Sequence, residues 1–155
     1  MERSALQSYI SNLSEGFVFP EEETDTQYLE VTVDRLVWHD LALKLRDDEQ
    51  TRFDLLFCVT GVDWPNHLSV VYHLESTTFR HILVVKVSTE NREEAILDTV
   101  SDIWSTAELH EREIYDLLGV HFNNHPKMER ILLTEDWVGH PLRKDYVDEV
   151  NIVLK

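Results

Sequence analysis

The sequence predicts a two-layer α+β domain, with helices packed on a mainly antiparallel sheet and an extended irregular segment at the C-terminal end. Two observations favour this class. The apolar residues switch between helical and strand spacing in the order helix, strands, helix, three strands, helices. Beyond residue 119, turn residues interrupt the chain so often that only one short apolar run remains, at 131–133. No internal repeat or low-complexity linker divides the chain, so we expect one domain over residues 1–155.

The first part of the chain predicts two helices and two short strands. A helix is expected over 3–15 and ends before Gly16, because its apolar residues recur at helical spacing. Strands follow at 17–19 and 28–33. A second helix begins with Asp34 as its N-cap and continues to about residue 44. The inward-facing residues of the two helices are Leu6, Ile10 and Leu13, then Val37, Leu41 and Leu45.

Three strands are expected next. Residues 53–60 form a nearly continuous apolar run bounded by Gly61, which predicts a central strand. Residues 68–75 and 81–88 predict an antiparallel hairpin. Cys58 is the single cysteine, so it is expected to be a small buried hydrophobic residue of the first of these strands. One cysteine also excludes a disulfide within the chain and a four-cysteine metal or iron–sulfur site.

Two more helices are expected before the irregular segment. Residues 93–104 predict a helix from their apolar set, which is Ala95, Ile96, Val100, Ile103 and Trp104. The next helix starts at a capping box formed by Ser105 and Glu108, and Gly119 ends it in a left-handed conformation. One face of this helix carries Ala107, Glu111, Ile114 and Leu118.

The composition excludes several classes of function. The net charge is −16, from 30 acidic and 14 basic residues, and a nucleic-acid partner requires a basic surface. The four glycines are far apart, so no glycine-rich phosphate loop is present. No apolar run is long enough to span a membrane, and the first residues resemble neither a signal peptide nor a transit peptide. We therefore expect a globular domain in the cytoplasm.

The segment from 108 to 146 is an ordered series of motifs. They are Glu111-Arg112-Glu113, Tyr115-Asp116-Leu117-Leu118-Gly119, Phe122, His125-Pro126, Arg130-Ile131-Leu132, Glu135-Asp136-Trp137, Gly139 and Pro141-Leu142-Arg143-Lys144-Asp145-Tyr146. Upstream stand Thr60-Gly61-Val62-Asp63-Trp64-Pro65 and Val70-Val71-Tyr72-His73-Leu74. Over roughly residues 50 to 146 the chain resembles the thirty-kilodalton subunit, also called the C subunit, of NADH:quinone oxidoreductase (respiratory complex I). It departs from the usual pattern at Glu129, where a basic residue is common, and at Val147, where a proline is common.

The resemblance implies a cofactor-free structural subunit in the peripheral arm of a proton-translocating NADH:quinone oxidoreductase. NADH, FMN, iron–sulfur clusters and quinone would belong to partner subunits. The implied partners are chiefly a chain like the D subunit and the small iron–sulfur subunits, at the cytoplasmic side of the cell membrane, with membrane association only through the complex. The equivalent subunit of a membrane-bound NiFe hydrogenase, or of another complex I-like oxidoreductase, is the alternative within the same class.

The expected site is an interface with partner subunits, with no catalytic, cofactor-binding or metal-binding residue on this chain. Arg112 and Asp116 are spaced to pair along the helix. Glu111 is expected to be partly buried and to need a cationic partner, which could be Arg112, Arg130, Arg143 or a residue of another chain. On this interpretation, Arg143→Ala or Asp116→Ala would impair assembly and quinone reduction and leave the isolated fold largely intact. The proposed interface residues are Glu111, Arg112, Glu113, Asp116, His125, Arg130, Trp137, Arg143, Lys144, Asp145 and Tyr146.

A stand-alone hydrolase is the alternative from a different class. It would use a metal or a carboxylate pair, because histidine and glutamate are common metal ligands and paired carboxylates serve in acid–base catalysis. The residues available for it are His110, Glu113, His121 and His125. The HERE sequence at 110–113 departs from the HExxH pattern, since the fifth position is Ile114.

Overall fold

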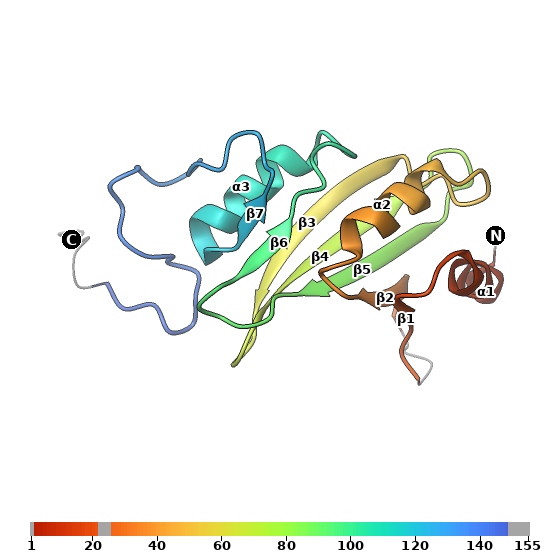
Figure 1. Cartoon of the computed structure of the whole chain (residues 1–155), viewed down its shortest axis with the longest axis horizontal. Helices are drawn as coiled ribbons and strands as arrows, with labels where there is room; N and C mark the ends of the chain where they lie inside the picture. The colour runs from red at the N-terminus through yellow and green to blue at the C-terminus, as the bar shows by residue number, and fades with distance from the viewer. Residues whose placement is uncertain (1, 22–25, 149–155) are drawn as a thin grey trace.

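The computed structural model describes residues 2–21 and 26–148, which have an α+β fold (Figure 1). The elements of this part of the chain are α1 (Arg3–Leu13), β1 (Phe17–Val18), β2 (Leu29–Val33), α2 (Trp38–Asp47), β3 (Leu55–Asp63), β4 (Leu68–Glu75), β5 (Ile82–Ser88), β6 (Ile96–Asp98), α3 (Ala107–Leu118) and β7 (His121–Asn123). The predicted α+β class is confirmed.

The main sheet has five strands in the order β1-β2-β5-β4-β3. Its neighbours are antiparallel except for β2 and β5, which run parallel over Leu29–Val33 and 83–87. The predicted hairpin of β4 and β5 is confirmed, with Tyr72 opposite Val85. The second sheet is a short parallel pair of β6 and β7.

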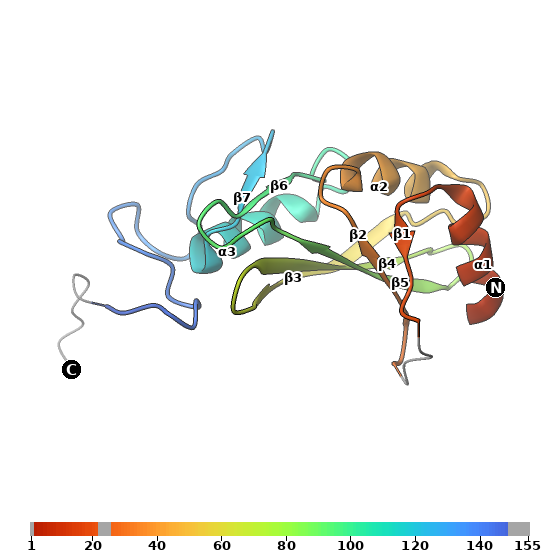
Figure 2. The same ribbon diagram turned by 60° about the horizontal axis from the view of Figure 1, so that its bottom comes forward.

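The two faces of the main sheet differ in polarity because side chains alternate along each strand. In Figure 2, α2 and α3 lie on the same side of the sheet. The face toward them is apolar and fully buried in β4 and β5, where it carries Leu68, Val70, Tyr72, Leu74, Leu83, Val85 and Val87. The opposite face mixes polar and apolar residues, among them Ser69, Val71, His73, Lys86 and Ser88.

Strand β3 lies at the edge of the sheet, so the prediction of a central strand was wrong. Helix α3 packs along this edge and occupies two of its backbone groups: Val59 N donates to His110 Nδ1 at 3.0 Å, and Thr106 Oγ1 donates to Leu56 O at 2.8 Å. Helix α3 therefore covers an edge that would otherwise present unpaired backbone groups. Cys58 lies in β3 as predicted but is only half-buried, beside a register shift after Leu56.

The helix predicted over 93–104 is absent, and this prediction was wrong. The segment contains the three-residue strand β6 followed by turns. Ala95, Val100, Ile103 and Trp104 are buried nevertheless, whereas Ile96 is exposed. The pairing of β6 with β7, some 25 residues later in the chain, overrides the local helical spacing.

Helix α2 begins at Trp38, later than predicted, and Val37 is exposed rather than inward. Asp34 does not cap the helix; its carboxylate accepts from Leu36 N at 2.7 Å within the turn that precedes α2. Leu41 and Leu45 face the core as predicted.

After β7 the chain contains turns and bends but no helix or strand over residues 124–148, which we call the strap. Figure 1 shows it in blue, arching past α3 at the end of the molecule opposite α1. The predicted irregular C-terminal segment is therefore present over these described residues.

Candidate functional site

Helix α3 is the element on which the strap is built. Its predicted inward face is confirmed, since Ala107, Glu111, Ile114 and Leu118 are all buried. Gly119 ends the helix in the left-handed region, with φ 77°, and its N–H donates to Ile114 O and Tyr115 O. The predicted capping box is not formed: Thr106 occupies the N-cap position and makes no side-chain cap hydrogen bond.

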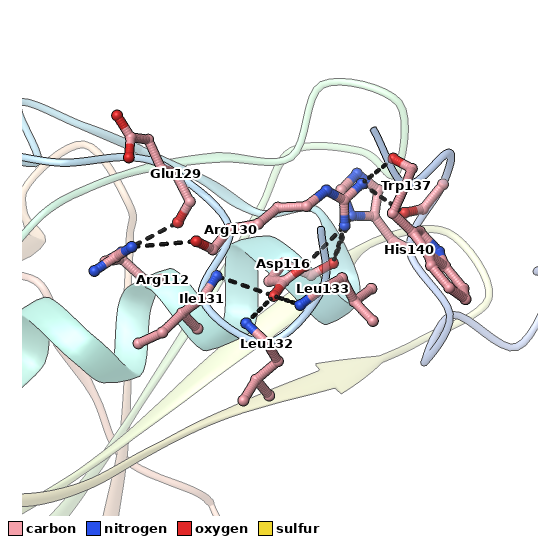
Figure 3. A network of polar contacts seen from close by, with 10 residues as sticks. Arg112, Asp116, Glu129, Arg130, Ile131, Leu132, Leu133, Trp137 and His140 are labelled. Atoms are coloured by element: carbon pink, nitrogen blue, oxygen red, sulfur yellow. Dashed lines mark hydrogen bonds and ion pairs between the residues drawn. The ribbon is translucent and has the colours of Figure 1, made fainter. Parts of the chain in front are cut away.

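Asp116 is the centre of the contact between α3 and the strap (Figure 3). Its side chain is fully buried, and one carboxylate oxygen accepts from Arg130 Nη1 at 2.8 Å. The other oxygen accepts three consecutive backbone N–H groups of the strap, from Ile131 at 3.1 Å, Leu132 at 2.7 Å and Leu133 at 2.9 Å. A single carboxylate therefore fixes the turn at 130–133 against the helix.

The pKa of Asp116 reflects two opposing effects. Burial raises it, but the N–H of Leu133, the guanidinium of Arg130 and the N–H groups of Leu132 and Ile131 hold the pKa below its ordinary value. The carboxylate is thus ionised at neutral pH, and its charge is matched within this chain.

Arg130 extends the same network into the strap. Its Nη2 donates to Trp137 O at 3.1 Å and to Gly139 O at 2.8 Å, which closes the strap into a loop (Figure 3). Arg112 donates to Glu129 O and Arg130 O, both at 3.1 Å. The predicted ion pair between Arg112 and Asp116 is therefore not formed, and Arg130 takes that place.

The last turn of α3 is capped by the strap. Backbone carbonyls at a helix end lack partners within the helix, and cationic side chains are favourable there. His140 Nδ1 donates to Asp116 O at 3.0 Å, Leu142 N donates to Leu117 O at 3.0 Å, and Arg143 Nε donates to Leu118 O at 2.6 Å.

His140 lies directly against Gly119. A Cβ atom on Gly119 would be 2.5 Å from the imidazole, so the glycine is needed for space as well as for its positive φ. Burial lowers the pKa of His140, and the nearby charges of Arg130 and Arg143 lower it further. The imidazole is accordingly neutral at physiological pH.

A second contact fastens the end of the strap to the tip of β3. Asp63 is buried, forms an ion pair with Arg92, and accepts from Lys144 N at 2.7 Å. Arg92 also reaches Asp145 Oδ1 at 3.0 Å. The hydrogen bond from Arg92 lowers the pKa of Asp63, and Lys144 N adds to this effect against the cost of burial.

Glu111 is completely buried, but none of the expected arginines reaches it. Its carboxyl group contacts Thr99 Oγ1, accepts from Val100 N at 2.9 Å, and lies 3.8 Å from His125 Nε2. Burial raises the pKa of Glu111 to about 7, although the hydrogen bonds from Thr99 and Val100 oppose this. The residue joins α3 to the turn after β6.

The residues of the hydrolase hypothesis do not converge on one centre. His110 Nδ1 accepts from Val59 N, and His125 uses both ring nitrogens, with Glu108 O and Lys127 N as partners. His121 and Glu113 are exposed. Among residues 2–21 and 26–148, no group of three or more His, Cys, Asp or Glu side chains is arranged to hold a metal ion.

The remaining predicted interface residues differ in exposure. Lys144, Asp145 and Glu113 are exposed, whereas Tyr146 and Trp137 are partly covered. Tyr146 packs against Gly139, where an added Cβ would lie 2.8 Å from the ring. The indole N–H of Trp137 is buried without a hydrogen-bond partner in the described part of the chain.

Four residues of the network were not predicted as site residues. Asp63, Arg92, Thr99 and His140 come from segments distant in sequence from the groups that they contact. Asp63 lies within one of the upstream motifs, which is the only sequence signal that singles out any of them.

Comparison with protein families gives one match over most of the chain. Residues 31–150 match the family described as respiratory-chain NADH dehydrogenase, 30 Kd subunit. The chain is 46% identical over 127 residues to the C/D subunit of NADH-quinone oxidoreductase from Phocaeicola vulgatus, covering 81% of this chain and 24% of that protein. It is 47% identical over 116 residues to the C subunit of NADH-quinone oxidoreductase from Chloroherpeton thalassium, covering 73% of this chain and 48% of that protein. The chain thus spans about a quarter and about half of these two relatives.

Two solved structures share the fold. One belongs to the membrane-bound sulfane sulfur reductase, an archaeal respiratory membrane complex; it has a TM-score of 0.78 at 27% identity, over 93% of this chain and 85% of that chain. The other is a trypsin-resistant fragment (1–134) of Nqo5, with a TM-score of 0.64 at 26% identity, over 82% of this chain and 99% of that chain. Among the described residues of the present chain, no helix is long and apolar enough to cross a membrane.

Proposed function

The chain belongs to the family of the 30 kDa subunit of respiratory-chain NADH dehydrogenase, and from this membership we propose its role. It is a cofactor-free structural subunit in the peripheral arm of a proton-translocating NADH:quinone oxidoreductase. It supports electron transfer from NADH to quinone by holding neighbouring subunits in register. NADH, FMN, the iron–sulfur clusters and quinone are bound by those neighbours.

The observation that carries this proposal is the surface of the strap. The strap uses the side chains of Arg130 and Arg143 inside the chain, where they hold it to α3, and the main-chain N–H of Lys144 fastens it to β3. Several of its apolar side chains lie at the surface: Leu132 is 63% exposed and Leu142 is 61% exposed, and Val138 and Val147 are exposed as well. A firmly held segment with several exposed apolar side chains is typical of a protein interface.

The proposed partner of this surface is a chain like the D subunit. Relatives from Phocaeicola and Bacteroides carry the combined designation C/D, so the two subunits occur joined in one protein. Subunits that function in one covalent chain must lie near each other in the complex. We propose the small iron–sulfur subunits as further neighbours, and we propose that this chain lies at the cytoplasmic side of the cell membrane without direct membrane contact.

The interface role predicted from the sequence changes in detail. Glu111, Arg112, Asp116 and Arg130 support the strap from within, so we propose that they act on the partner through the strap's position. Direct contact is proposed for the exposed groups of Glu113, Lys144, Asp145 and the apolar residues of the strap. His125, Trp137, Arg143 and Tyr146 hold the strap's shape.

A related respiratory complex is the second candidate. The likeness to a chain of the archaeal sulfane sulfur reductase complex favours a component shared by several such assemblies. The identities of 46% and 47% to NADH-quinone oxidoreductase subunits, against 27% to the archaeal chain, favour the NADH:quinone complex.

Affinity purification from the native host tests the proposal. The wild-type chain should recover a D-like subunit and iron–sulfur subunits, and the double variant Leu132→Asp/Leu142→Asp should lose them. Leu36→Asp is the matched control, because Leu36 is 72% exposed in the turn before α2, outside the strap. Recovery of hydrogenase or sulfur-reductase chains would favour the second candidate. Unchanged recovery with the strap variant would remove the strap from the interface.

A further inference from the structure

A groove of about 530 Å³ opens on the face of the sheet that lies opposite α2 and α3. Val62 of β3 and Val71 of β4 line it, together with the side chain of Trp64 in the turn between these strands. Cross-strand pairing places Val62 opposite Ser69, and Ser69 opposite Ser88, and Thr32 of β2 also lines the groove, which therefore crosses four adjacent strands. Trp64 is 47% exposed.

The motif that contains Trp64 is only partly explained by the fold. Gly61 leaves room for α3, because an added Cβ would lie 2.3 Å from Leu118 Cδ1. Asp63 is required to hold Arg92 and Lys144 N. Trp64 is different: its carbonyl accepts from Arg92, which fixes its backbone, but its indole is left half-exposed at the groove, stacked on His67 with ring centroids 6.2 Å apart.

The charges at the groove indicate the chemistry of what it binds. Among the described residues that line it, Lys86 is the one lysine or arginine, and Lys86 Nζ pairs with Glu30 Oε2 at 2.6 Å on the neighbouring strand. The hydroxyl groups of Ser69 and Ser88 bond to each other at 2.9 Å. Because these polar groups already have partners and the centre of the groove is apolar, the partner surface that fits the groove is an uncharged apolar segment.

We infer that the groove beside Trp64 is a second docking site, which receives an apolar segment of the D-like subunit. This inference rests on the proposed function. Two observations select that occupant over others. The end of the strap is fastened at Asp63, the residue before Trp64, so this end of the strap lies next to the rim of the groove. In addition, the C and D subunits occur joined in single proteins among the relatives.

Trp64 has the properties of an energetic anchor. Tryptophan is enriched among interface residues whose truncation costs most, and such residues fill pockets near the centre of an interface. The Trp64 backbone is held at the rim of the groove by its contact with Arg92, so little ordering is needed when a partner covers the indole.

Site-specific photocrosslinking in the native complex tests the inference. A benzophenone amino acid replaces Trp64 in the full chain, and the control replaces Phe79, which is 42% exposed in the turn at the opposite end of β4. The expected result is a crosslink from position 64 to the D-like subunit and none from position 79. Loss of the D-like subunit from the position-64 variant alone would support the site equally.

Other crosslinks from position 64 would overturn the inference: to a second copy of this chain, to residues 149–155 of the same chain, or to a different subunit. So would a D-like subunit that co-purifies without any crosslink. If the wild-type chain recovers no D-like subunit at all, the proposed function fails and the inference fails with it, so the two failures are distinguishable. As a second measure, Trp64→Ala should weaken binding of the D-like subunit by about tenfold or more, whereas Phe79→Ala should leave it unchanged.

Discussion

Arg130 donates from one guanidinium nitrogen to both the carboxylate and the main-chain carbonyl of Asp116, at 2.8 Å in each case. The two residues lie 14 positions apart, on α3 and on the strap. Through this contact the strap stabilises the last turn of the helix, and the helix fixes the path of the strap. The conformation of the proposed interface therefore depends on a buried ion pair within the chain.

We expect Asp116→Asn to release the strap and destabilise the domain. Asparagine keeps the shape but loses the charge, which leaves Arg130 poorly matched, and breaking a buried pair costs about 3 kcal/mol. The free energy of unfolding in urea should fall by that order, and trypsin should cleave faster at Lys127 and Arg143. Glu113→Gln, an exposed position one turn away, is the control and should behave like the wild type. This prediction replaces the one made from the sequence, that a substitution of Asp116 leaves the fold largely intact.

Glu111 should make stability depend on pH. Its pKa is raised to about 7 in the folded chain from an ordinary value of 4.5, so the folded state holds a proton that the unfolded state has lost. The resulting stabilisation is fully present below about pH 4.5 and is lost as the pH rises through about 7. The shift corresponds to roughly 3 kcal/mol.

The measurement compares the wild type with Glu111→Gln in urea unfolding from about pH 5 to pH 8, the range that brackets the raised pKa. Glutamine keeps an oxygen for Val100 N and an NH₂ group for Thr99 but has no proton to lose. The stability of the wild type relative to the variant should decline steadily over this range. A difference that stays constant with pH would show that Glu111 does not titrate there.

Gly61→Ala should destabilise the contact between β3 and α3. The new methyl group would lie 2.3 Å from Leu118 Cδ1 and 3.2 Å from Ile114 Cγ2, and such overpacking costs about 1–3 kcal/mol. Because the closest clash is with one side chain, the double variant Gly61→Ala/Leu118→Ala should be more stable than the sum of the single changes predicts. Additive effects in this double-mutant cycle would contradict the contact.

His110→Ala should expose the edge of the sheet at Val59. The imidazole accepts the Val59 N–H at 3.0 Å, and this group faces away from β4. Hydrogen exchange of the Val59 amide should become faster, while the amide of Val85 in the inner strand β5 keeps its protection. His121→Ala is the control, since His121 is exposed. An unchanged exchange rate at Val59 would mean that His110 does not protect this edge.

The sequence predicted the elements whose signals are local. The spacing of Leu6 and Ile10, the hairpin of β4 and β5, and the helix ended by Gly119 all follow from neighbouring residues, and the structure confirms them. The pattern failed at residues 93–104, where apolar spacing typical of a helix belongs to a short strand and turns. The partner strand β7 decides that outcome, and it is not visible in the spacing itself.

The sequence identified most residues of the candidate site but not which of them contact each other. The motif residues from Glu111 to Tyr146 do gather around α3, yet spacing along the helix suggested Arg112 as the partner of Asp116. The structure supplies Arg130 instead, and it gives Glu111 a hydroxyl and an amide rather than an arginine. Each of these partners lies in a turn outside α3. Its position therefore depends on the path of the chain between that turn and the helix, which residue spacing does not give.

Between its fixed points the strap passes through Thr134, Glu135 and Asp136, which are all exposed. Extra residues inserted there would leave unchanged the contacts of the strap with the carboxylate of Asp116 and with Asp63. Only the distance to which the strap projects from the domain at residues 134–136 would change. Evolution can therefore lengthen or shorten this span to suit neighbours of different size while keeping the same domain beneath it.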